Sequence, residues 1–153
     1  MNRSALLPLL LLSCAVACSR RMESTALGLQ YEPPPGMALS AEEPGPPAVA
    51  RFEGGLELRS VEGAPPKLEA PPEEVLGAAG LAVPGTRVNA TQGTLDAGPV
   101  ARYEFQKGPS RTLVYFLPRP ERFVLVLYTA PERDYGKGSL RVERSLSTLK
   151  PTR

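Results

Sequence analysis

The chain contains no histidine and no tryptophan, and its only two cysteines are Cys14 and Cys18. Without an imidazole, neither a Ser-His-Asp triad nor a Cys-His pair can form. A zinc site would need carboxylate ligands alone, which is an unusual donor set. After residue 18 the chain has no thiol, so it can form no internal disulfide there. These absences exclude the commonest routes to nucleophilic, zinc-dependent and thiol-based chemistry.

Strong charge of either sign is also absent, because 18 basic residues stand against 16 acidic ones. So small a net charge does not provide the basic surface that nucleic acid requires, and we expect no nucleic-acid partner. The adjacent acids Glu42-Glu43 and Glu73-Glu74 lie in proline-rich or helix-starting contexts, which are typical of solvated side chains and not of an acid/base pair. We therefore expect no catalytic residue, no metal and no cofactor, and predict that the protein is not an enzyme.

Residues 1–17 have the three parts of a signal peptide. A short start carries Arg3, an apolar run follows over 5–12, and small residues come next. The apolar run is interrupted by Pro8 and falls short of the roughly 20 residues of a spanning helix. A cleaved leader is therefore favoured over a retained transmembrane anchor.

The leader ends in Ala15-Val16-Ala17, directly before Cys18. These four residues resemble the lipobox of bacterial lipoprotein precursors. Leu11-Leu12-Ser13-Cys14 has a similar form. Cleavage before Cys14 would leave a leader shorter than the usual length of about 15 to 30 residues, so Cys18 is favoured as the lipidated residue. An ordinary secretory leader, cut after Ala17, is the alternative.

This resemblance implies a diacylglycerol thioether on Cys18 and an acylated, palmitate-type amino terminus. Several acyl chains together anchor a protein stably in a membrane. The implied location is the bacterial cell envelope. Ser19, and not the aspartate that signals inner-membrane retention, follows the cysteine. In a cell with two membranes the implied site is the outer membrane, facing the periplasm.

The remainder divides into a polar tether over 18–27 and one domain over 28–150. Ten of the 18 prolines fall between Pro33 and Pro72, which indicates extended and turn conformations there. The pattern in this half predicts strands over 28–32, 49–53 and 56–61, with a turn at Gly54-Gly55 and a short helix over 72–79.

The second half predicts strands over 87–91, 100–106, 111–117 and 122–129, arranged as an antiparallel meander. The last two have apolar side chains on both faces, so we expect them to be central strands covered on both sides. After Pro131 a helix is predicted that ends at Lys150. Its packed side chains are Val142, Leu146 and Leu149, and its outward side chains are Arg141, Glu143 and Arg144. The predicted fold class is α+β: an antiparallel β-sheet meander with a short middle helix and a C-terminal helix packed on it.

The order of elements resembles the PsbP-like and DcrB-like group of small extracytoplasmic domains. The matching segments are Leu29-Gln30-Tyr31-Glu32-Pro33 with Pro35-Gly36-Met37, the strands over 111–118 and 122–130, and Tyr135 with the last helix. The resemblance implies an antiparallel sheet between helices, and implies no activity. The chain departs from this group in the middle, where it has only the short helix over 72–79.

Tyrosines and arginines on or beside the predicted sheet are the remaining candidates for a site. Arg119 and Arg122 flank the hairpin tip Pro118-Arg119-Pro120-Glu121 and are our candidate contact surface. For the others we expect core aromatics and edge charges. These others are Arg102, Tyr103, Arg111, Tyr115, Tyr128, Arg133 and Tyr135.

The sequence thus favours a non-catalytic envelope lipoprotein that acts as a binding or assembly-accessory module. Its expected partners are the membrane, through the lipid on Cys18, and another envelope protein. The alternative hypothesis is a carrier or sensor of a small apolar ligand, bound in a cleft between sheet and helix.

Overall fold

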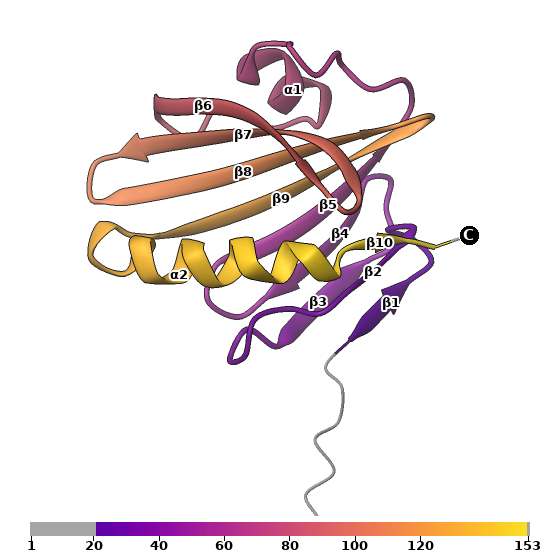
Figure 1. Cartoon of the computed structure of the whole chain (residues 1–153), viewed down its shortest axis with the longest axis horizontal. Helices are drawn as coiled ribbons and strands as arrows, with labels where there is room; N and C mark the ends of the chain where they lie inside the picture. Colours follow the sequence, from indigo (N-terminus) through magenta and orange to yellow (C-terminus); the bar gives the residue numbers. More distant parts are fainter. Residues whose placement is uncertain (1–20, 153) are drawn as a thin grey trace, which may run out of the picture.

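The computed structural model describes residues 21–152, in which an antiparallel β-sheet and two α-helices form an α+β fold (Figure 1). The expected fold class is confirmed at this level. The predicted leader over 1–17 and both cysteines lie outside the described residues. The main sheet has seven strands, in the spatial order β3-β4-β5-β9-β8-β7-β6. Their bounds are β3 (Leu39–Glu43), β4 (Ala48–Phe52), β5 (Leu56–Glu62), β6 (Thr86–Leu95), β7 (Gly98–Lys107), β8 (Ser110–Arg119) and β9 (Arg122–Pro131).

A second, three-stranded sheet joins the two ends of the described chain. It consists of β1 (Met22–Ser24), β2 (Leu29–Tyr31) and β10 (Lys150–Pro151), with β2 in the middle. The predicted strand over 28–32 belongs to this sheet. Ser24 and Leu27 are buried, so the packed structure begins at Met22, within the segment 18–27 that was predicted as a tether.

The chain order is kept from β6 to β9, where each strand pairs with the next. It is broken after β5, which pairs with β9 and not with β6, so the sheet is not one continuous meander. This arrangement gives β9 a neighbour on each side. Strand β3 was not predicted, because all five of its residues are exposed and two of them are glutamates.

Buried side chains lie on both faces of the sheet. The first cluster lies on the face covered by α2 (Glu132–Ser145) and includes Leu113, Val124 and Val126. The second contains Phe116 and Leu125 together with Val75 and Leu76 of α1 (Pro72–Ala78). The two apolar faces of β8 and β9 thus belong to different halves of the core.

The predicted middle helix is confirmed to within one residue. Pro72 occupies its first turn, and Gly80, at φ +71°, ends it. The N–H of Leu81 donates to the Leu76 carbonyl and the N–H of Gly80 to the Gly77 carbonyl. This pattern closes a helix at a left-handed glycine.

The last helix is shorter than predicted. Helix α2 ends at Ser145, a 3₁₀ turn η1 (Leu146–Thr148) follows, and Lys150 is in strand β10. The two glycines inside α2 differ in their surroundings. A Cβ atom at Gly138 would overlap the Tyr128 hydroxyl, whereas one at Gly136 would meet nothing within 4 Å. Gly138 therefore lets α2 approach β9 closely.

We predict that Gly138→Ala destabilises the protein by about 1 to 3 kcal/mol, because the added methyl group must displace the buried Tyr128 ring. The matched change Gly136→Ala should stabilise it by up to about 1 kcal/mol, since alanine is the better helix former. Urea unfolding of the two variants measures both effects. Equal responses at the two positions would contradict the close packing of α2 on β9.

Candidate functional site

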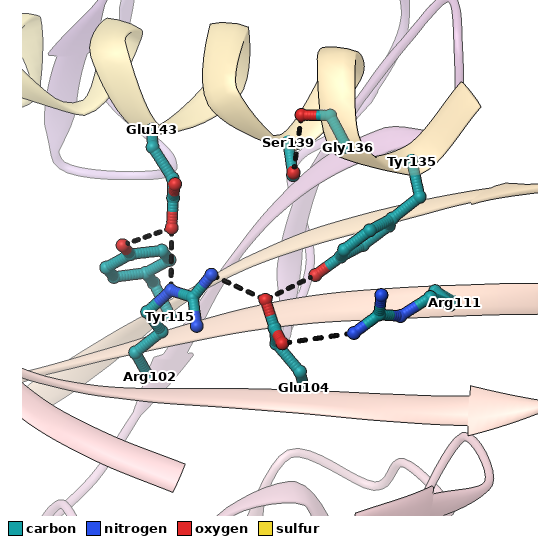
Figure 2. A network of polar contacts seen from close by, with 8 residues as sticks. All are labelled: Arg102, Glu104, Arg111, Tyr115, Tyr135, Gly136, Ser139 and Glu143. Atoms are coloured by element: carbon teal, nitrogen blue, oxygen red, sulfur yellow. Dashed lines mark hydrogen bonds and ion pairs between the residues drawn. The ribbon is translucent and has the colours of Figure 1, made fainter. Parts of the chain in front are cut away.

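A network of polar side chains lies between α2 and the sheet (Figure 2). Alternate residues of a strand point to the same face, so residues 102 and 104 of β7, and residues 111 and 115 of β8, all face α2. Positions 135, 139 and 143 recur every four residues along α2 and form one stripe of that helix. The charged and phenolic members are Arg102, Glu104, Arg111, Tyr115, Tyr135 and Glu143.

Arg102 connects the sheet to the helix. Its Nε donates to Glu143 Oε1 at 2.6 Å, and its Nη2 donates to Glu104 Oε1 at 2.6 Å. The Tyr115 hydroxyl donates to the same Glu143 oxygen at 2.8 Å. The Glu143 carboxylate of α2 therefore accepts hydrogen bonds from two different strands.

Glu104 is the second acceptor of the network. The Tyr135 hydroxyl donates to its Oε1 at 3.0 Å, and Arg111 Nη2 donates to its Oε2 at 3.3 Å. The Arg111 guanidinium carbon lies 4.6 Å from the centre of the Tyr135 ring, in cation–π contact. The buried Arg111 Nε has no hydrogen-bond partner among the described residues.

The surroundings shift the pKa values of Glu104, Tyr115 and Tyr135. Burial raises the pKa of Glu104, but the hydrogen bonds from Arg102 and Tyr135 and the nearby arginine charges outweigh it, so the net pKa is lowered. Burial and the hydrogen bond to Glu143 raise the pKa of Tyr115 to about 12. Burial and the bond to Glu104 likewise raise the pKa of Tyr135. The arrangement is suited to holding α2 on the sheet, with two arginines facing two carboxylates.

The arginines and tyrosines of this network were predicted as candidates from the sequence, but its carboxylates were not. Glu143 was predicted to point outward, and this is wrong: its carboxylate faces the sheet. Position 143 directly follows the buried Val142 and lies four residues after the buried Ser139, so it borders the packed stripe of the helix. The Arg-x-Glu spacing of Arg102 and Glu104 on one strand was the available signal.

The candidate contact residues Arg119 and Arg122 lie at a different place, at the tip of the β8–β9 hairpin. They are directly opposite each other in the strand register. Arg119 Nη1 donates to the Ala97 carbonyl at 2.6 Å, and Arg122 Nη1 donates to the Leu27 carbonyl at 3.4 Å. Neither forms an ion pair within residues 21–152, although Glu62 is opposite Arg122 in the strand register and Glu121 lies between the two arginines at the hairpin tip.

Both arginines border an open pocket of about 420 Å³ at the end of the molecule where β1 and β10 lie. Thr25 and Thr152 line the same pocket. Below it is an apolar recess with about 20 Å³ of free space, lined by Leu27, Leu29, Ala97, Leu117, Val124 and Leu149 among others. The guanidinium groups thus lie between an apolar floor and solvent.

The other predicted residues lie in separate places. The Tyr103 hydroxyl donates to the Ala70 carbonyl on the face covered by α1. Tyr128 stacks on Tyr135 beside the network, with ring centres 6.1 Å apart. Arg133 is 84% exposed on α2 and pairs only with its neighbour Asp134. The structure therefore splits the predicted set into a helix-anchoring network, an arginine pair and isolated residues.

Within residues 21–152, no group of three or more Asp or Glu side chains is placed to hold a metal ion. None of the helices in this part of the chain has the length and apolar character to cross a membrane. Comparisons with protein-family models and with curated proteins give no match to this chain.

We predict that Glu104→Gln lowers the free energy of unfolding by about 2 kcal/mol near pH 7, because it leaves Arg102 and Arg111 without their shared carboxylate. The folded-state pKa of Glu104 is lowered. The stability from its charge is therefore present above the unfolded pKa near 4.3, and is lost as pH falls through the lower folded value.

The difference between wild type and Glu104→Gln should accordingly shrink on acidification below about pH 4. Denaturant unfolding over this pH range measures it. The control is Glu74→Gln on the exposed first turn of α1, which should change stability by less than about 0.5 kcal/mol. A difference that stays constant down to about pH 3 would show that the carboxylate charge of Glu104 is not what stabilises the fold.

Proposed function

We propose that this chain is a membrane-anchored envelope lipoprotein whose domain is a non-catalytic binding or assembly-accessory module. The observation that carries the proposal is the Ala-Val-Ala-Cys18 ending of the apolar leader. Strand β1 starts only four residues after Cys18, at Met22. Four residues span at most about 14 Å, so lipid on Cys18 would hold the domain at the membrane surface.

The arginine pair is the surface that we assign to the partner. Arg119 and Arg122 face a pocket that is open to solvent, and neither is ion-paired within the described chain, although Glu121 also lines the pocket. Guanidinium groups bind carboxylates through paired hydrogen bonds, and arginine is enriched at protein interfaces. The proposed partner is another envelope protein that presents acidic side chains to this pocket.

The position of the pocket also suits a protein that works close to the membrane. Thr25 lines it and lies seven residues after Cys18, so the pocket is within about 25 Å of the proposed anchor. A partner bound there would lie near the same membrane surface.

The alternative of an apolar-ligand carrier has less support. The recess below Arg119 and Arg122, at the end of the layer between the sheet and α2, has about 20 Å³ of free space. That space admits a single water molecule, whereas ligand pockets measure roughly 300 to 1,000 Å³. The larger open pocket between β9 and α2, of about 590 Å³, is lined by Arg133, Asp134, Lys137 and Arg141, whose charges do not suit an apolar ligand.

For the anchor, we predict that Cys18→Ser releases the protein from the membrane fraction, because the variant has no site for lipid attachment. The matched change Cys14→Ser should leave it in the membrane fraction, since Cys14 is removed with the leader. Fractionation and metabolic labelling with a radioactive fatty acid measure both variants. If Cys18→Ser stays in the membrane fraction and retains label, the assignment of Cys18 is wrong.

For the contact surface, we predict that the double variant Arg119→Glu and Arg122→Glu loses at least about 90% of the protein that is crosslinked to wild type in intact cells. Reversing both charges would repel an acidic partner, with an expected cost above about 1.4 kcal/mol. Arg133→Glu is the matched control, because Arg133 is exposed on α2 and away from the pocket. Equal crosslinking by both variants would exclude the arginine pair as the contact surface.

A further inference from the structure

Strand β6 is a free edge of the main sheet. It pairs with β7 on one side, and no described strand pairs with its other side. Its residues are exposed over nine of its ten positions. From Val88 to Leu95 the strand carries no charge and no proline. Natural proteins usually place charged residues or prolines on a long edge strand. Without them, the unpaired N–H and C=O groups of the edge can bind other strands.

The opposite edge of the sheet is protected in this way. Strand β3 has five residues, ends in Glu42-Glu43, and its register is interrupted between Leu39 and Ala41. Short length and like charges oppose pairing with a further strand. Strand β6 also has a register irregularity, between Arg87 and Asn89, but it is ten residues long and is uncharged from Val88 to Leu95, so it is the less protected edge.

The register shows which groups of β6 point outward. In a hairpin with a two-residue loop, the closing residues bond to each other, and bonded pairs then alternate along the ladder. The closing pairs here are Leu95 with Gly98 and Lys107 with Ser110. Both hairpins give the same result for β7: its even-numbered residues bond to β6 and its odd-numbered residues bond to β8. The β6 residues that direct N–H and C=O groups to the free edge are therefore Ala90, Gln92 and Thr94.

We propose that β6 pairs antiparallel with β6 of a second copy of this chain, centred on Gln92, so that the sheet continues across a two-fold dimer. In this register the outward groups of Ala90 meet those of Thr94 in the other copy, and Gln92 meets Gln92. The inference concerns self-association and goes beyond the proposed anchor and partner surface.

Charge complementarity selects a second copy as the occupant. Pairing centred on Gln92 brings Asp96, the first residue of the loop after β6, opposite Val88 of the second copy and therefore next to its Arg87, and does so at both ends of the dimer. Between these two complementary ends the paired strands are uncharged, so no like charges face each other. The interface is thus self-complementary, as a two-fold contact requires.

The groove beside β6 agrees with this geometry. It has a volume of about 520 Å³ and lies between the segment 68–72 and the strands β6 and β7, with Ala90, Gln92 and Tyr103 in its wall. The two-fold axis of an antiparallel strand pair is perpendicular to the sheet, so both grooves would lie on one face of the dimer. The two α2 helices would lie on the other face. Neither the segment 68–72 nor α2 would then lie between the two paired β6 strands.

Site-specific crosslinking tests the register. In the full chain carrying Cys14→Ser and Cys18→Ser, every native thiol is absent, so dimerisation is measured independently of the lipid anchor. Gln92→Cys should crosslink to itself with a short bis-maleimide, because the two Cβ atoms would lie about 5 Å apart. Val88→Cys, exposed on the same strand, would be about 26 Å from its counterpart and should crosslink at least ten-fold more slowly. Equal rates at the two positions would overturn the proposed register.

Sedimentation over a range of protein concentrations, in the same cysteine-free chain, tests the edge contact. The unmodified strand should form a dimer. Gln92→Pro should be monomeric, because proline removes an outward N–H without removing a bond to β7. Gln92→Ala keeps that N–H and should remain dimeric. A monomer at every concentration, or a dimer that Gln92→Pro does not weaken, would overturn the proposal.

Discussion

The hairpin of β8 and β9 has apolar side chains on both faces, and the rest of the fold is arranged to keep both faces from water. Phe116 and Leu125 are fully buried on one face, and Leu113 and Val126 are buried on the other. A sheet of this kind is stable only if each face is covered and neither strand lies at an edge. The pairing of β5 with β9 meets the second condition, and α1 and α2 meet the first.

Helix α2 covers its face with a combination of apolar and ionic contacts. Val142 of α2 and Leu146 of the following 3₁₀ turn η1 supply the buried apolar part, and Gly138 brings the helix close to the Tyr128 ring. Arg102 then joins Glu143 of the helix to Glu104 of the sheet. Partly buried ion pairs add modest net stability, because desolvation offsets much of the attraction. Their geometric demands are stricter than those of apolar packing, so we infer that they fix the position of α2 along the strands.

The surfaces that we assign to binding are well separated from this network. The arginine pair lies where both ends of the described chain meet, a few residues after the proposed lipid, and it contacts the loop that follows β6, because Arg119 donates to the Ala97 carbonyl. The proposed partner surface and the proposed dimer edge therefore adjoin at the C-terminal end of β6.

Much of the local structure could be predicted from residue patterns alone. The strands β7 to β9, the short helix α1 and the Gly54-Gly55 turn follow from alternation, proline position and glycine, because each depends on neighbours in sequence. The proposed lipobox is likewise a pattern of consecutive residues. Pairing between β5 and β9, burial of Leu27, and the inward turn of Glu143 could not be predicted in this way. Each depends on residues that are distant in sequence, as Glu143 depends on Arg102. Only the tertiary structure decides which charges and strand edges find a partner and which stay free.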